Sequence, residues 1–136
     1  MSVLFAKSLL RENISFALLS KTNVVFDTRN GITPLLTRAD DNFFGCIAAD
    51  KIVGEAAAWL YTLTKPDAIA TLIITTKAKQ ILMTAGIPYF YDSEVPMTLG
   101  RDGTSRCPIE ESVIDAVSSG DALEKIKTKI KTFSAK

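Results

Sequence analysis

The chain has 136 residues, the usual length of a single domain, so we expect one domain spanning residues 1–136. Its 16 basic and 15 acidic side chains leave a net charge of +1, which excludes a strong global field that would attract nucleic acid or an anionic membrane. It contains no histidine, which excludes the usual general base of serine and cysteine hydrolases and the commonest zinc ligand.

The first third of the chain predicts a helix, a β-hairpin and a short helix. Apolar residues recur near helical spacing over 2–12, with Ser2 as a suitable N-cap. Two apolar runs, 14–19 and 24–26, flank a polar segment and predict the hairpin. Thr33-Pro34 then predicts a short helix through Ala39, because proline suits the first helical turn.

The middle of the chain predicts alternating helices and strands. A small apolar run over 45–49 leads into Asp50, which is well placed to cap a helix over 51–63. The apolar, β-branched run over 68–74 is typical of a strand that is covered on both faces. A helix over 77–85, ended by Gly86, and a strand over 87–91 follow.

The last third begins with a long connection over 92–106, and loops of this length in compact domains are often functional. Pro108 begins a helix through Val117, and a lysine-rich helix over 122–133 ends the chain. Its lysines are better explained as a solvated helix face than as a nucleic-acid patch, because no aromatic platform accompanies them. The whole order predicts a three-layer α/β/α fold with a mixed sheet, in which ligands bind beyond the strand carboxyl ends.

The longest apolar stretches have the length of a strand and fall well short of the roughly 20 residues that cross a bilayer. The first ten residues lack the continuous apolar region and the cleavage site of a secretory signal. We therefore expect a cytoplasmic protein that has no membrane partner. The two cysteines, Cys46 and Cys107, are far apart in the sequence and are predicted to be free thiols.

Cys107 directly precedes Pro108, which predicts a position at a helix N-terminus. Unpaired amides and the helix dipole favour a thiolate there, and Arg101 and Arg106 would strengthen that effect. The alternative is that Cys107 points into the core as a small hydrophobic side chain. The polar, glycine-containing loop before it favours the functional interpretation.

Asp50 and Lys51 form a second candidate site. The simpler explanation is that Asp50 caps a helix and that Lys51 pairs with Glu55 one turn later. However, a residue that caps a helix directly after a strand also occupies the position from which side chains reach a cleft.

The loop over 99–106 combines two glycines, two arginines and hydroxyl side chains. This composition suits the capture of a phosphate or carboxylate through Arg101, Arg106 and backbone amides near Asp102, Gly103 and Thr104. The alternative is an ordinary turn with its tightest corner at Asp102-Gly103.

Two blocks of sequence resemble a known family. One is Ala49-Asp50-Lys51-Ile-Val-Gly54-Glu-Ala-Ala-Ala, and the other is Arg101-Asp-Gly-Thr-Ser-Arg-Cys107-Pro-Ile-Glu110-Glu-Ser-Val113. They resemble the bacterial and archaeal family known as domain of unknown function 1893, over nearly the whole chain. Members of that family look like the cytidine deaminase fold, so the resemblance implies a single domain of that fold.

The resemblance also implies where the site lies. Deaminases place a histidine or cysteine and a glutamate at the start of one helix, and Pro-Cys-x-x-Cys at the start of another, to bind zinc and transfer a proton. Asp50 stands roughly in the place of the first ligand and Cys107 in that of one paired cysteine. Glu110 stands where the second cysteine is expected. The resemblance therefore implies the place of the site rather than deamination, and we expect neither a bound metal nor another cofactor.

Two functions remain open. The first is a deaminase-fold protein whose remodelled, zinc-free pocket binds a nucleotide-like or other small anionic ligand. In it, Cys107 is a nucleophile or ligand, Asp50 an acid/base or orienting group, and Lys51 a charge partner. The groups expected to bind the ligand are Arg101, Asp102, Gly103, Thr104, Arg106 and Glu110. The second is a non-catalytic ligand-binding or regulatory module that kept the fold and lost the activity.

Two further expectations concern assembly. A purely structural subunit is favoured if Asp50 and Cys107 prove to lie far apart. By analogy with deaminase-fold proteins we expect a homo-oligomer, and the apolar segments 43–44 and 59–61 are candidate contacts.

Overall fold

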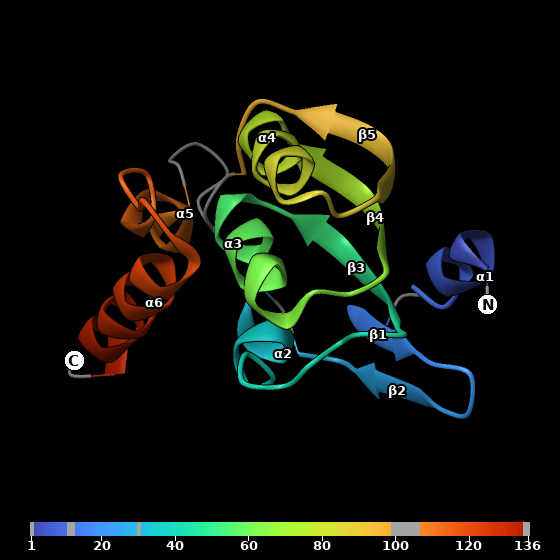
Figure 1. The fold of residues 1–136 in the computed structure, drawn as a ribbon. Coiled ribbons are helices and arrows are strands. Elements are labelled where there is room, and N and C mark those ends of the chain that lie inside the picture. The colour runs from blue at the N-terminus through green and yellow to red at the C-terminus, as the bar shows by residue number, and fades with distance from the viewer. Residues whose placement is uncertain (1, 11–12, 30, 99–106, 135–136) are drawn as a thin grey trace.

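The computed structural model describes residues 2–10, 13–29, 31–98 and 107–134. Within them the chain forms a five-stranded open mixed sheet and six helices (Figure 1). No helix among these residues is long and apolar enough to cross a membrane. The elements in chain order are α1 (Val3–Ser8), β1 (Phe16–Leu19), β2 (Val24–Asp27), α2 (Thr33–Leu36), β3 (Ile47–Val53), α3 (Glu55–Thr64), β4 (Ala68–Thr75), α4 (Thr76–Ala85), β5 (Tyr89–Val95), α5 (Pro108–Ser112) and α6 (Ser119–Ser134).

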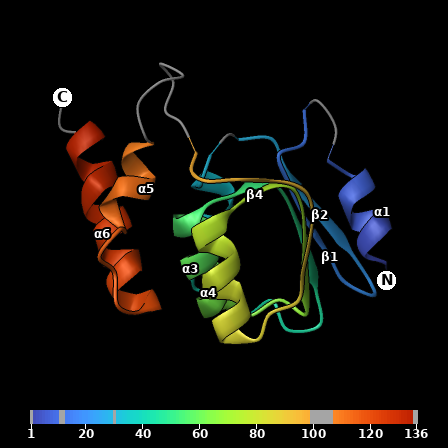
Figure 2. The same ribbon diagram turned by 90° about the horizontal axis from the view of Figure 1, so that it is seen from above.

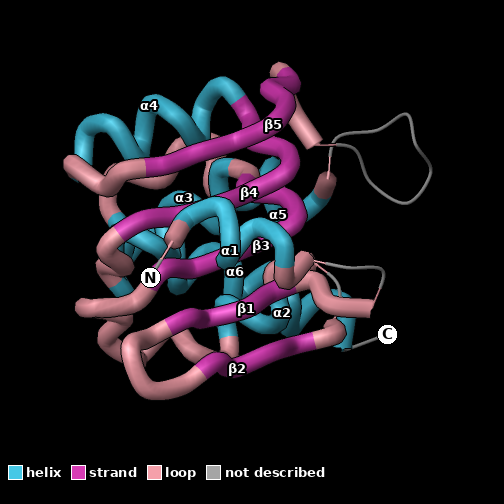
Figure 3. The backbone as a smooth tube through the Cα atoms, turned by 90° about the vertical axis from the view of Figure 1, so that its right-hand side faces the viewer, coloured by secondary structure: helices cyan, strands magenta, loops and turns pink. Residues whose placement is uncertain are grey.

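The strand order in the sheet is β2-β1-β3-β4-β5, which can be followed from bottom to top in Figure 3. β1 pairs antiparallel with both β2 and β3, whereas β3, β4 and β5 run parallel to one another. The carboxyl ends of these three parallel strands therefore meet at one edge of the sheet. Open α/β sheets commonly bind ligands at this edge.

Helices cover the two faces of the sheet unequally (Figures 1 and 2). α1 lies alone on one face, α3 and α4 lie on the other, and α5 and α6 form a further layer outside α3. The face under α1 is built from a row of register partners, Ala17, Ala49 and Ala70, all of them buried. Because alanine is small, the helix can approach the strands closely.

Most of the predicted elements are confirmed. The hairpin is formed by β1 and β2, and the buried strand is β4. α4 ends at Gly86, which adopts the left-handed conformation (φ 73°) expected of a glycine after a helix. α1 has Ser2 as its N-cap, with the Ser2 hydroxyl accepting a hydrogen bond from the Phe5 amide. α1, α2 and α5 are shorter than the sequence predicts.

The predicted helix over 51–63 is wrong at its start. Asp50 and Lys51 belong to β3, the central strand, and α3 begins only at Glu55, after Gly54. Asp50 therefore does not cap a helix, and Lys51 and Glu55 do not share one. The sequence misleads because alanines followed by an Asp-Lys pair are typical of a capped helix. Close packing under α1 instead requires alanines in a strand, and packing overrides propensity.

The predicted apolar contacts between subunits are also mostly buried within the chain. Phe43 and Tyr61 are fully buried in the main core, and Trp59 packs partly against it. Only Phe44, which is 81% exposed, keeps the accessibility that an intermolecular contact requires.

Candidate functional site

A pocket of about 390 Å³ lies at the carboxyl end of β3, beside the start of β1. Its walls are largely apolar and include Ile32, Ile52 and Ile109. A few polar groups converge on it from the start of β1, from β3, and from α5 and the residues before it. Apolar walls with a small number of polar groups are typical of sites for small molecules.

Four of the predicted site residues meet in this pocket. Asp50 and Lys51 reach it from β3, and Cys107 and Glu110 reach it from the start of α5. Asp50 and Cys107 therefore lie at the same pocket. A purely structural subunit was favoured only if these two residues lay far apart, so that alternative is not supported. The other predicted site residues, Arg101, Asp102, Gly103, Thr104 and Arg106, lie outside the described residues.

Asp50 is a buried carboxyl group at the wall of the pocket, only 9% exposed. Its Oδ2 accepts a hydrogen bond of 2.9 Å from the hydroxyl of Tyr61, which lies on α3. Burial raises the pKa of Asp50 from 3.8 to about 7, although the Tyr61 hydroxyl and the backbone N–H groups of Ile52 and Lys51 act in the opposite direction. Asp50 therefore exchanges a proton near neutral pH.

Glu110 joins α5 to the start of α3. Its Oε2 accepts a buried hydrogen bond of 3.0 Å from the backbone amide of Ala56, in the first turn of α3. The residue at the N-cap position is Gly54, which has no side chain to cap the helix. The Glu110 carboxylate thus acts as the N-cap of α3 and also places a negative charge at the positive end of the helix dipole.

Gly54 leaves room for the same contact. A Cβ atom at this position would lie 2.1 Å from Oε1 of Glu110, far closer than two such atoms can approach. The backbone conformation of Gly54 (φ −95°) is open to any residue. A side chain here is opposed by space, because the Glu110 carboxylate would have to move out of its bond with Ala56. Both residues belong to the two sequence blocks described above, and the structure gives a physical reason for their combination.

Cys107 is the N-cap residue of α5 and is partly exposed at the pocket. Its backbone N–H donates a hydrogen bond of 3.1 Å to the carbonyl oxygen of Thr98. α5 has only five residues, so the helix dipole at this thiol is smaller than the long predicted helix implied. An activated Cys107 thiolate therefore stays a prediction.

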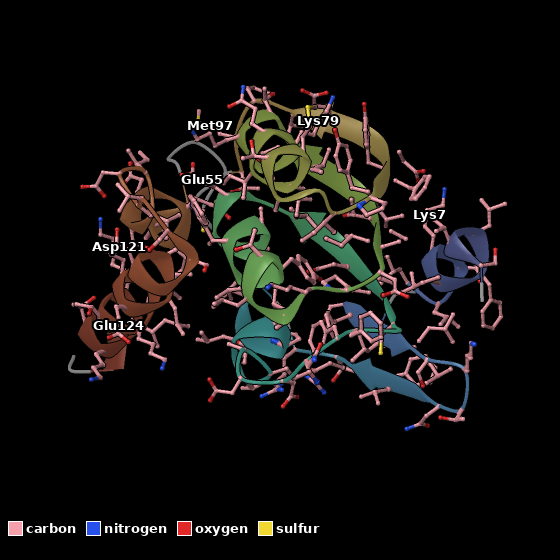
Figure 4. The ribbon with its side chains drawn as sticks, in the orientation of Figure 1. Lys7, Glu55, Lys79, Met97, Asp121 and Glu124 are labelled. Carbon is pink, nitrogen blue, oxygen red and sulfur yellow. The ribbon has the colours of Figure 1, made fainter. Side chains whose placement is uncertain are left out.

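A second, much smaller cavity of about 10 Å³ adjoins the pocket, and Thr98 and Glu110 line both. Glu55, at the start of α3, and Met97 also border it, and Figure 4 places these two side chains at the same end of the sheet. The cavity has room for about one water molecule. The Thr98 hydroxyl is buried and has no hydrogen-bond partner within the described ranges, and such a group is commonly bound by an ordered water.

An ion-pair network positions the opposite wall of the pocket. Asp27, at the end of β2, accepts hydrogen bonds from Arg29 and Arg38, and these contacts hold its pKa well below the ordinary value. Arg38 also lies over the ring of Phe16 on β1, at 5.3 Å from its centre. The network joins β2 to α2, between which lies the pocket residue Ile32.

The described part of the chain contains no group of three or more histidine, cysteine, aspartate or glutamate side chains placed to bind one metal ion. Sequence reasoning missed three residues of this region: Gly54, Tyr61 and Thr98. Gly54 lay within a quoted block, but its partner was not evident. Tyr61 had the appearance of an ordinary apolar helix position, and Thr98 carries no recognisable signal.

The family described as TM1506, domain of unknown function (DUF1893), matches residues 5–130. A solved structure that is similar to the chain is that of a DUF1893 family protein (TM1506) from Thermotoga maritima. The two are 29% identical, the match covers 90% of this chain and 82% of that one, and the TM-score is 0.78. No curated protein matches the chain.

We predict that Gly54→Ala lowers the free energy of unfolding by about 1–3 kcal/mol, because the new methyl group collides with the Glu110 carboxylate. In a Glu110→Ala background the same change should cost clearly less, because the colliding group is absent and only the poorer N-cap propensity of alanine remains. Urea denaturation of the two single variants and the double variant measures this coupling. Equal costs of Gly54→Ala in both backgrounds would show that the two residues are not in contact.

We also predict that Asp50 makes stability depend on pH between about 4 and 7. The folded-state pKa is raised from 3.8 to about 7, so in this range the folded protein holds a proton that the unfolded chain has released. The free energy of unfolding therefore falls as the pH rises through this window, by an amount on the order of 4 kcal/mol for the full shift.

Asp50→Asn provides the comparison, because asparagine can still accept the Tyr61 hydrogen bond but does not ionise. Urea denaturation at pH 5 and pH 8 should show that the wild type loses more stability than the variant between these two values. Parallel pH dependence of the two proteins would contradict the assignment.

Proposed function

The chain belongs to the DUF1893 family, and from that premise we propose that its pocket binds a small ligand that is nucleotide-like or otherwise anionic. Asp50 acts in it as an acid/base or orienting group, and Lys51 is the charge partner of the ligand. The observation that carries this proposal is the meeting of Asp50, Lys51, Cys107 and Glu110, from two distant segments, in one pocket.

The proposed fold is cytidine deaminase-like, in a single domain over residues 1–136. The five-stranded mixed sheet with helices on both faces supports this proposal. So does the position of the pocket, which lies where a strand gives way to a helix and where a second helix approaches it. One cysteine and two carboxyl groups that are already bonded to Ala56 and Tyr61 are a poor zinc site, so the proposed pocket works without a metal.

The chemistry of the pocket suits proton exchange with a bound ligand. A group whose pKa lies near the working pH is most effective as a general acid or base, and Asp50 meets this condition. At pH values below about 7 Asp50 is mostly uncharged, which leaves Lys51 to attract an anion. Above pH 7 the ionised Asp50 repels an anion, so the affinity for an anionic ligand should fall as the pH rises.

The alternative is a ligand-binding or regulatory module without catalysis. It is favoured by the structural partners of both carboxyl groups, since Asp50 is bonded to Tyr61 and Glu110 to Ala56. These contacts would maintain the pocket even if no reaction took place in it. Turnover of a bound ligand separates the two functions.

We predict that at least one nucleoside, nucleoside monophosphate or small carboxylate raises the melting temperature of the protein. A ligand at one hundred times its Kd adds about 2.7 kcal/mol to the free energy of unfolding. Lys51→Met should abolish the shift for an anion. Lys21→Met, which removes the same charge from the exposed β1–β2 turn, should leave it intact. A panel without any shift, or an equal loss in both variants, would count against the pocket.

We predict that Cys107 reacts with iodoacetamide at pH 6–7 faster than an ordinary cysteine with a pKa near 8.5 does. Cys46 is the internal reference, because burial raises the pKa of its thiol. Single-cysteine variants, Cys46→Ser and Cys107→Ser, separate the two rates. If the rate at Cys107 rises with pH as an ordinary thiol does, Cys107 is only part of the wall and the thiolate chemistry is ruled out.

A further inference from the structure

Asp50 accepts a hydrogen bond from a residue that does not line the pocket. Tyr61 is 0% exposed, and its hydroxyl donates to Oδ2 of Asp50 across 2.9 Å. Burial raises the pKa of the Tyr61 hydroxyl, so it remains a donor throughout the physiological range. A protonated phenol in this position is a permanent hydrogen-bond donor to the carboxyl group in front of it.

We propose that Tyr61 is the positioning residue of this pocket: its hydroxyl orients the Asp50 carboxyl group for the ligand and stabilises its ionised form. The proposal rests on the proposed function, since it treats Asp50 as the group that meets the ligand. It also restricts the ligand. An ionised carboxylate only accepts hydrogen bonds, so the part of the ligand that meets Asp50 above its pKa carries a donor such as an amine, an amide N–H or a hydroxyl.

The α3 helix brings Tyr61 to this place because the residues before it are small. Gly54 and Ala57 line the pocket and Ala58 is fully buried, so this side of the helix lies close to β3. Tyr61 lies one turn after Ala57 and two turns after Gly54, so helical spacing places it on the same side. It is the first residue of the series that is long enough to reach the carboxyl group.

The strands beside Asp50 do not supply a substitute for Tyr61. The register partner on β1 is Phe16, which has no polar side-chain atom, and the partner on β4 is Thr71. The Thr71 hydroxyl donates its hydrogen to the carbonyl oxygen of Ile73 at 3.0 Å and is therefore engaged elsewhere. Among the described residues, the side-chain donor to Asp50 is thus Tyr61.

Other ionisable groups around Asp50 would also act on its titration. Lys51 follows it on β3, and the Asp27–Arg38 ion pair lies beyond Phe16 on the β1 side. The groups contributed by the helices at the same end of the sheet are Glu55, Cys107 and Glu110. A change at Tyr61 alters none of these side chains, so a shift that follows it reports the hydrogen bond itself.

The test is a titration of the Asp50 carboxyl carbon by NMR in the intact protein labelled with ¹³C-aspartate, with Asp50→Asn to assign the signal. In Tyr61→Phe the midpoint should move to higher pH by about one to two units, because the ionised form loses a donor. Tyr91→Phe is the matched control. It removes the same hydroxyl from β5, where the Tyr91 oxygen accepts from Lys79, and should leave the midpoint unchanged.

An unchanged midpoint in folded Tyr61→Phe overturns the proposal, and so does an equal shift in Tyr91→Phe. If Tyr61→Phe does not fold, replacing the three tyrosines by 3-fluorotyrosine makes the phenol a stronger donor without a cavity. The midpoint should then move to lower pH, and a midpoint that does not move overturns the proposal. No ligand is needed for this test. A pocket that binds none of the ligand panel would refute the proposed function while the titration still decided the role of Tyr61.

Discussion

The hydrogen bond from the Ala56 amide to the Glu110 carboxylate joins two segments that are more than fifty residues apart. The N-cap residue of α3 is Gly54, which offers no side-chain cap, so the first turn of α3 accepts its cap from a carboxylate of α5. The same bond fixes α5 over the carboxyl end of β3. Cys107, at the start of α5, thereby comes to line the same pocket as Asp50. Ile109 and Val113 also pack this segment against the main core, so the bond sets the position of α5 together with apolar contacts.

The burial of the Asp50 carboxyl group opposes folding, whereas the bond between Glu110 and Ala56 stabilises the fold. A carboxyl group taken out of water favours its neutral form, and three hydrogen-bond donors around Asp50 only partly offset that cost. Buried apolar residues would stabilise a central strand better than an aspartate and a lysine do. Positions where a chain lacks the residue that would be most stable there are often functional. Asp50 and Lys51 are therefore the main candidates for function in the pocket.

The sequence placed Asp50 and Cys107 in one predicted site, and both line the pocket, whose functional role stays a prediction. The expectation that Asp50 caps a helix was wrong, because alanines in β3 serve close packing rather than helix formation. Gly54 was visible in the sequence, yet nothing there shows which side chain occupies the space that it leaves. Tyr61 has the hydrophobic pattern of a core residue, and only its hydrogen bond to Asp50 distinguishes it.

The most direct test of the account is the hydrogen exchange of the Ala56 amide. An amide in the first turn of a helix has no acceptor within the helix and normally exchanges quickly. We expect the Ala56 amide to be protected in the wild type and to exchange at least about tenfold faster in Glu110→Ala, because a lost hydrogen bond of about 1.4 kcal/mol corresponds to that factor. The Ala78 amide, which is bonded to the Thr75 hydroxyl, should be unaffected. Rapid exchange of Ala56 in the wild type, or equal exchange in both proteins, would contradict the docking of α5 on α3.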